Sequence, residues 1–68
     1  MMTYGDIVNL LAQQGKINSD DAKRVAEYYW RRGIIGRTSS SFTIQNNAYS
    51  ERSMIQRVMV EARKEVVE

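Results

Sequence analysis

The chain of 68 residues contains no cysteine, no histidine and no proline, and it has only four glycines. Without cysteine no disulfide can brace the fold, and without cysteine and histidine the usual zinc ligand sets are excluded. The same absences exclude nucleophile and base pairs of the Ser-His and Cys-His kind, and no glycine stands in a phosphate-binding loop motif. We therefore predict a protein that is not an enzyme, with no catalytic residues, no metal and no cofactor.

Long hydrophobic runs are absent as well. The longest stretch without a charged residue, 38–50, is polar, so no segment has the pattern of a membrane span. The first residues lack the basic leader and the apolar stretch of a secretory signal. We expect a cytoplasmic protein with no membrane partner.

The composition, 43% hydrophobic and 26% charged, is typical of a globular protein. The length allows a single domain over residues 1–68, and a chain of this size buries only about 60% of the surface that its unfolded form exposes. Because such a core is thin and no disulfide or zinc site supports it, we expect a homodimer.

Two helices are predicted in the first half of the chain. The first covers about 3–14, with Thr3 as its N-cap, apolar residues at helical spacing, and Gly15 as a left-handed C-cap. The second covers about 19–32, after a polar run whose two aspartates, Asp20 and Asp21, suit the positive end of a helix dipole. Gly33 ends it, in a Schellman motif in which the next residue folds back toward Tyr29.

The second half is predicted to form a hairpin and a third helix. Short β-rich segments over about 34–45 predict two antiparallel strands with Phe42 and Ile44 facing the core. The last helix covers about 50–67, with Ser50 as its N-cap and a long apolar stripe. The expected fold is therefore α+β, in the order helix, helix, hairpin, helix.

Positive charge is concentrated in the middle of the chain. The net charge is only +2, but residues 23–37 hold five basic residues and one acid, Glu27, which gives a local balance of +4. From residue 51 onward four basic residues balance four acidic ones. Any attraction for a polyanion is therefore predicted to lie between residues 23 and 37.

Three consecutive aromatic residues, Tyr28, Tyr29 and Trp30, fall in the second predicted helix. They cannot all face one core, because consecutive positions sweep most of the helix circumference. Tyr28 and the edge of Trp30 are either half-exposed amphipathic rings or part of an interface. Tyr, Trp and Arg are enriched at binding hot spots, which favours the interface.

Residues 25–37, followed by 42–44, resemble the end of a winged-helix domain, where a helix that finishes in a basic-Gly-aliphatic-aliphatic step leads into a two-stranded wing. Residues 7–11 and 15–17 look like the first helix of that family and its following turn. The segment between Ile17 and Gly33 departs from the family, because it is shorter and holds one helix only. The resemblance implies that the helix before the wing enters the major groove and that the wing contacts the DNA backbone or minor groove. The residues to which it assigns these roles are Lys23, Arg24, Glu27, Tyr28, Arg31, Arg37, Ser39, Ser40 and Ser41.

Our leading functional prediction is a small DNA-binding regulator that acts as a homodimer. The predicted DNA-binding residues are Lys23, Arg24, Tyr28, Arg31, Arg32, Arg37, Ser39 and Ser40, with the four arginines on phosphates and with Lys23 and Tyr28 nearest the bases. The alternative is a protein-binding adaptor or inhibitor, of the size that phages and plasmids often encode, which would use an aromatic and arginine patch against a host protein. The predicted protein-interface residues, including those of a homodimer, are Tyr28, Trp30, Met54, Val58, Met59 and Val66.

Overall fold

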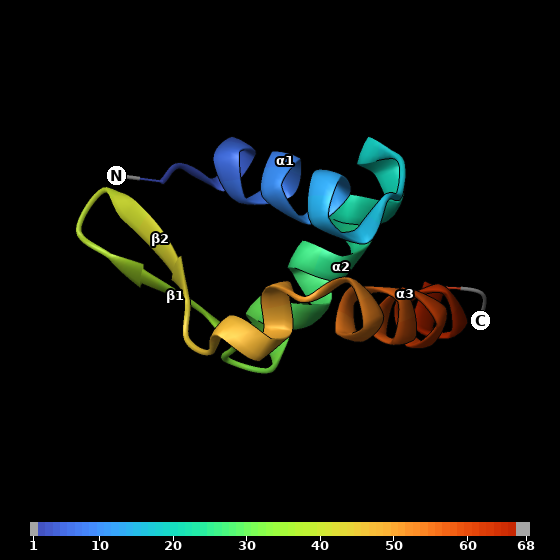
Figure 1. Ribbon diagram of the computed structural model, residues 1–68. Coiled ribbons are helices and arrows are strands. Elements are labelled where there is room, and N and C mark those ends of the chain that lie inside the picture. Colours follow the sequence, from blue (N-terminus) through green and yellow to red (C-terminus); the bar gives the residue numbers. More distant parts are fainter. Residues whose placement is uncertain (1, 67–68) are drawn as a thin grey trace.

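The structure is a computed structural model and describes residues 2–66, with side chains described as far as Lys64. Three helices and a two-stranded antiparallel sheet follow one another in the predicted order, so the α+β fold is confirmed (Figure 1). The elements are α1 (Tyr4–Gly15), α2 (Ser19–Arg31), β1 (Ile35–Thr38), β2 (Ser41–Ile44), the 3-10 helix η1 (Asn47–Ser50) and α3 (Arg52–Val66). The hairpin lies at one end of the molecule, and the last turns of α3 lie at the other (Figure 1).

Both ends of α1 are fixed by local hydrogen bonds, but only the first is the one predicted. Thr3 caps the helix, since its hydroxyl accepts from the amide of Asp6 at 3.2 Å while the Asp6 carboxylate accepts from the amide of Thr3 at 3.0 Å. At the other end the left-handed residue is Lys16, with φ 53°, and not Gly15. The prediction for Gly15 as the left-handed cap is therefore wrong.

Gly15 is needed for a different reason, the close approach of α3. A Cβ at this position would overlap the Cγ2 atom of Ile55. The glycine thus lets α1 and α3 pack at short range, which is a requirement of tertiary packing and not of backbone conformation.

The ends of α2 are those that the sequence predicts. The side chain of Asn18 accepts from the amide of Asp21 at 2.8 Å and caps the N-terminus. At the C-terminus Gly33 has φ +73°, its amide donates to the Trp30 carbonyl, and the amide of Ile34 donates to the Tyr29 carbonyl at 2.8 Å. These two bonds confirm the Schellman motif.

The hairpin is closed by a two-residue turn. Thr38 pairs with Ser41 and Arg37 pairs with Phe42, which leaves Ser39 and Ser40 as the turn. Ser39 occupies the turn with φ 56°. On the outer edge of β2, the amide of Phe42 donates to the carbonyl of Met2 at 2.8 Å, which holds the start of the chain against the sheet.

The approach to α3 differs from the prediction. Residues 47–50 form the 3-10 helix η1, and the Ser50 hydroxyl donates to the carbonyl of Asn47 at 2.7 Å instead of capping α3. The helix begins at Arg52, and the first backbone bond into it runs from the amide of Ile55 to the carbonyl of Glu51. The prediction that Ser50 caps the last helix is therefore wrong, because its hydroxyl is used within the preceding turn.

The core is formed where the three helices and β1 meet. Its buried side chains are Ile7, Val8, Leu11, Ala22, Val25, Ala26, Tyr29, Ile35, Ile55, Val58 and Ala62. Tyr29 is fully buried, and its hydroxyl donates to the carbonyl of Tyr49 at 2.7 Å while the two rings meet edge to face. Phe42 and Ile44 pack against this core from the sheet, as predicted.

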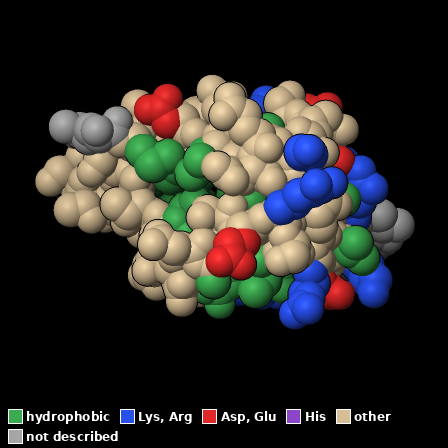
Figure 2. All heavy atoms as spheres, viewed as in Figure 1, with side chains coloured by type: hydrophobic (Ala, Val, Ile, Leu, Met, Phe, Trp, Pro, Cys, Tyr) green, Lys and Arg blue, Asp and Glu red, His purple; other side chains and the backbone are tan. Residues whose placement is uncertain are grey.

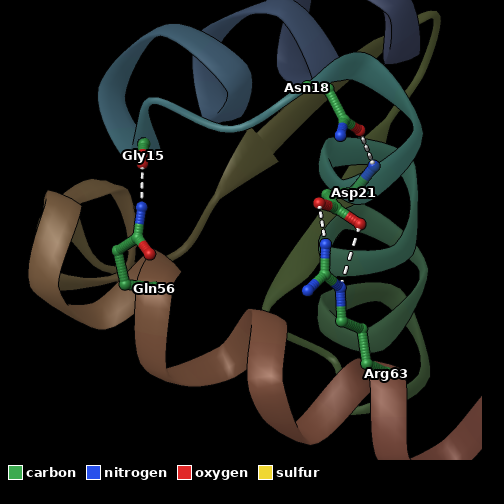
Figure 3. Close-up of polar contacts among 5 residues, drawn as sticks. All are labelled: Gly15, Asn18, Asp21, Gln56 and Arg63. Carbon is green, nitrogen blue, oxygen red and sulfur yellow. Dashed lines mark hydrogen bonds and ion pairs between the residues drawn. The ribbon is translucent and has the colours of Figure 1, made fainter.

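Polar contacts from α3 fix the connection between α1 and α2 (Figure 3). The Gln56 amide donates to the carbonyl of Gly15, at the end of α1. The Arg63 guanidinium holds the buried carboxylate of Asp21, at the start of α2, through Nε at 3.2 Å and Nη2 at 2.5 Å. One helix therefore sets the position of α2 relative to α1 from both sides of the turn.

Among residues 2–66, no helix has both the length and the apolar character that crossing a bilayer requires.

Candidate nucleic-acid interface

The connection between α1 and α2 is as short as the turn of a helix-turn-helix. Only residues 16–18 separate the two helices, and a turn of three or four residues is typical of that motif. Figure 1 shows α2 running obliquely away from α1 and behind α3. In a helix-turn-helix it is the second helix that lies in the major groove.

The side of α2 that faces away from the core carries three of the eight predicted DNA-binding residues. Its core side buries Ala22, Val25, Ala26 and Tyr29, so positions half a turn away point outward. The exposed residues of α2 are Ser19, Asp20, Lys23, Arg24, Glu27, Trp30 and Arg31. The structure therefore brings three predicted cations onto one side of α2, and it also places two acids there.

The hairpin continues this surface. Arg37 of β1 and Arg31 of α2 both line the same open depression, which has a volume of about 490 Å³. Its lining residues, which define what we call the aromatic depression, are Tyr4, Glu27, Trp30, Arg31, Arg37 and Phe42. The depression thus joins the end of α2, the start of α1 and both strands.

Three aromatic rings form the apolar part of the aromatic depression. The ring centres of Trp30 and Phe42 lie 5.6 Å apart at an interplanar angle of 50°. Tyr4 meets Phe42 edge to face at 5.9 Å. Trp30 remains 47% exposed, which is unusual for the largest apolar side chain of so small a protein.

Charged groups surround these rings. The Arg37 guanidinium carbon lies 5.8 Å from the centre of the Phe42 ring, and its Nε donates to the carbonyl of Ser39 at 3.2 Å. On the other side, partial burial and then the charge of Glu27 raise the pKa of the Tyr4 hydroxyl above its ordinary value. The raised pKa keeps the Tyr4 hydroxyl protonated further into the alkaline range, and at neutral pH this hydroxyl can donate a hydrogen bond.

The tip of the hairpin presents hydroxyl groups beside Arg37. Ser39 and Ser40 are both exposed there, and the Ser41 hydroxyl donates to the Thr38 carbonyl at 2.9 Å. Hydroxyls and arginine at the tip of a wing are suited to contacts with a sugar-phosphate backbone.

Tyr28 and Trp30 do not form one patch. Tyr28 is half-buried, and the Arg32 guanidinium carbon lies 3.7 Å above its ring. Trp30 instead gathers with Tyr4 and Phe42, which lie far away in the sequence. From the sequence, both residues were expected on the core-facing sides of the first helix and the hairpin. No pattern in the sequence indicated that they would meet Trp30.

The predicted dimer residues of α3 are mostly occupied within the domain. Val58 is 7% exposed and belongs to the core, and Met54 and Met59 are half-buried against it. Val66 lies outside the described side chains. Among the described side chains of α3, the large hydrophobic one that is exposed is Val60, at 49%, which was not among the predicted interface residues.

Four basic residues, Arg52, Arg57, Arg63 and Lys64, are exposed on α3. Figure 2 shows Lys and Arg side chains gathering toward the α3 end of the face that carries α1 and α3. The net charge of residues 51–68 is zero, so the charge count did not predict that basic side chains would gather here. Arg63, however, is engaged with Asp21, and Lys64 lies 3.8 Å from the Glu61 carboxylate.

The described part of the chain contains no group of three or more Asp or Glu side chains that could hold a metal ion. Comparison with known proteins finds no matching family model, no matching curated protein and no matching solved structure. The geometry of α2 and the hairpin therefore carries the functional argument by itself.

Proposed function

We propose that this protein binds double-stranded DNA, with α2 in the major groove and the β1–β2 hairpin on the flanking backbone. The observation that carries the proposal is the sequence of elements itself. Three residues join α1 to α2, as in a helix-turn-helix, and α2 leads through a Schellman motif directly into the hairpin. Arg37 of the hairpin lines the same depression as Arg31 in the last turn of α2. The resemblance to winged-helix domains assigns the same two elements to DNA.

Seven of the eight predicted residues have a role in this proposal, and Tyr28 has none, because its half-buried ring packs against the Arg32 guanidinium. Arg31 and Arg37 contact phosphates where helix and hairpin meet, and Arg24 and Arg32 contact phosphates along α2. Lys23 projects from the outward side of α2 toward base edges. Ser39 and Ser40 contact the backbone from the hairpin tip.

The proposal includes regulation as the role and a homodimer as the active form. Helix-turn-helix proteins commonly read two half-sites as dimers, and a core this thin gains stability from a second copy. Exposed Val60 on α3 is the apolar side chain through which two copies would meet.

The test is a titration of a fluorescent duplex of mixed sequence, followed by anisotropy. With about four phosphate contacts, affinity should fall by roughly two decades between about 50 and 200 mM salt. Arg31→Ala and Arg37→Ala should each weaken binding to all sequences and reduce the salt slope by about one. The matched control is Arg57→Ala, because Arg57 is exposed on α3, which packs against the opposite side of α2.

Absence of binding at about 10 µM protein in low salt would refute the proposal, since nonspecific DNA binding is usually detectable there. Equal loss of affinity in Arg57→Ala and Arg37→Ala would also refute the assignment of the face. A loss confined to one DNA sequence would contradict the phosphate role of Arg31 and Arg37.

A second candidate function is a protein-binding adaptor, and the exposure of Trp30 favours it. A half-exposed Trp with Tyr, Phe and two arginines around it has the composition of a binding hot spot. On this proposal Trp30→Ala abolishes binding to a protein partner and leaves the salt-dependent DNA titration as it was. Loss of DNA binding in the same variant would count against the adaptor.

A further inference from the structure

The aromatic depression combines two chemistries that a plain DNA-binding surface does not need together. Its lining includes two aromatic rings in tilted contact, Trp30 and Phe42, and two guanidinium groups, Arg31 and Arg37. Phosphate contacts alone explain the arginines but leave an exposed Trp without a partner. A ligand that explains both features must carry a flat ring and an anion close together.

We propose that the aromatic depression receives a single unpaired nucleotide, with its base stacked on the exposed ring of Trp30 beside Phe42 and its phosphate held by Arg31 and Arg37. The inference rests on the proposed DNA function, because it names what the same face recognises beyond regular duplex. Base stacking on aromatic side chains beside a positively charged rim is how single-stranded nucleic acid is bound in general. A volume of about 490 Å³ is within the usual range of about 300–1,000 Å³ for small-ligand sites and accommodates one nucleotide.

The shape of the site decides between receiving a base and inserting a side chain. Side chains that kink DNA act as wedges and must protrude between base steps. The rings of Trp30, Phe42 and Tyr4 line a depression, so they accept a protruding group and do not present one. A bulged or extrahelical base is such a group.

The polar edge of the depression predicts which base is preferred. Glu27 lines the depression together with Tyr4, and an ionised carboxylate can only accept hydrogen bonds. Cytosine and adenine present an exocyclic amine to such an acceptor, whereas the single N3–H donor of thymine lies between two carbonyl oxygens that a carboxylate repels. We therefore expect an unpaired cytosine to bind more tightly than an unpaired thymine.

The chain offers a clean readout, because Trp30 is its only Trp. Three duplexes of one sequence are compared at low salt: fully paired, with one bulged cytosine, and with one bulged thymine. Affinity is measured by anisotropy, and stacking is measured by quenching of the intrinsic fluorescence of Trp30. We expect the bulged cytosine to bind at least about fivefold more tightly than paired duplex, which is the lower end of what stacking one base contributes.

Two variants of Trp30 separate stacking from simple loss of packing. Trp30→Leu should bring the affinity ratio of bulged to paired duplex down to about one, whereas Trp30→Phe should retain most of it because a ring remains. Because Trp30 is 47% exposed, neither variant removes a buried core side chain, and circular dichroism confirms the fold of each. Glu27→Gln should reduce the preference for cytosine over thymine without removing the preference for a bulge.

Three results would overturn the inference. Equal binding of all three duplexes with no quenching overturns it and leaves the duplex-binding proposal standing. If the protein binds none of the three duplexes, both the inference and the duplex-binding proposal are refuted. Quenching of Trp30 by a synthetic peptide of alternating glutamate and leucine, with none by bulged DNA, overturns it in favour of a protein partner at the same depression.

Discussion

Replacing Gly15 with alanine should destabilise the protein even though alanine is the better helix former. A Cβ at position 15 overlaps Ile55 Cγ2 and lies 3.1 Å from Ile55 Cβ. Ile55 is fully buried and cannot move away without disturbing the packing of α3 on α1. Gly5, in the first turn of the same helix, is the matched control, because the nearest atom to its added Cβ is Thr3 Oγ1 at 3.8 Å.

The magnitude follows from two opposing contributions. Overpacking a core costs about 1–3 kcal/mol, and the gain in helix propensity from Gly to Ala is at most about 1 kcal/mol. We expect Gly15→Ala to lower the free energy of unfolding by about 1–2 kcal/mol. Gly5→Ala should raise it by about 0.5 kcal/mol, since only the propensity contribution remains.

Urea unfolding followed by circular dichroism measures both effects. A domain of this size has an m-value of about 1 kcal/mol per molar urea, so the midpoint of Gly15→Ala should fall by roughly 1–2 M. Adding Ile55→Leu, which has one γ-carbon fewer, should recover part of that loss in a double-mutant cycle. A midpoint for Gly15→Ala at or above the wild-type value would refute the reasoning that close helix packing requires this glycine.

Three further substitutions test other parts of the fold, each by the same urea titration. Asp21→Asn weakens the contact with Arg63 and should lower the free energy of unfolding by about 1–2 kcal/mol. The loss is smaller than for a fully buried pair because Arg63 is half-exposed, and no loss at all would show that the pair does not hold α3 to α2. Gly33→Ala should cost about 1 kcal/mol, because its φ of +73° disfavours a side chain although nothing crowds the position; a neutral result would contradict the Schellman motif. Burial, and then the neighbouring tyrosines, raise the pKa of Tyr29 well above its unfolded value of 10.0. Above pH 10 the folded state therefore keeps a proton that the unfolded state loses, and the free energy of unfolding should fall as the pH rises. Tyr29→Phe, which also loses the hydrogen bond to the Tyr49 carbonyl, should be about 1 kcal/mol less stable at pH 7 and should lose this alkaline decline; an unchanged decline would assign it to other groups.

The proposed function depends on how α2 is held. Its outward face can enter a groove only if α2 keeps its orientation relative to α1 and the hairpin, and α3 supplies the contacts that keep it there. Gln56 binds the end of α1 and Arg63 binds the start of α2, while the Schellman motif sets the direction in which the chain enters β1. Variants of these contacts should therefore alter DNA affinity without touching DNA.

The local features of the fold could be predicted from the sequence because their hydrogen bonds span only a few residues. Thr3 caps α1 through Asp6, three residues away, and the Schellman bond at Gly33 joins Ile34 to Tyr29. The helical spacing of apolar residues predicted the three helices, and the short β-rich segments between the second and third predicted the hairpin. The 3-10 helix before α3 was missed because its polar residues also fit a turn.

Only the tertiary structure decided the contacts between residues that lie far apart in the chain. The bonds from Gln56 to Gly15 and from Arg63 to Asp21 span 41 and 42 residues, and no local pattern distinguishes Asp21 from an ordinary acid in the first turn of a helix. In the same way, Gly15 looks like a helix terminator in the sequence, whereas its lack of a side chain serves the approach of Ile55. The aromatic depression belongs to this class too, because Tyr4 and Phe42 meet only when Met2 pairs with the edge of β2 and brings the start of α1 to the sheet. The sequence by itself thus determined the three helices, the hairpin and the basic character of residues 23–37, and packing decided which side chains share a site.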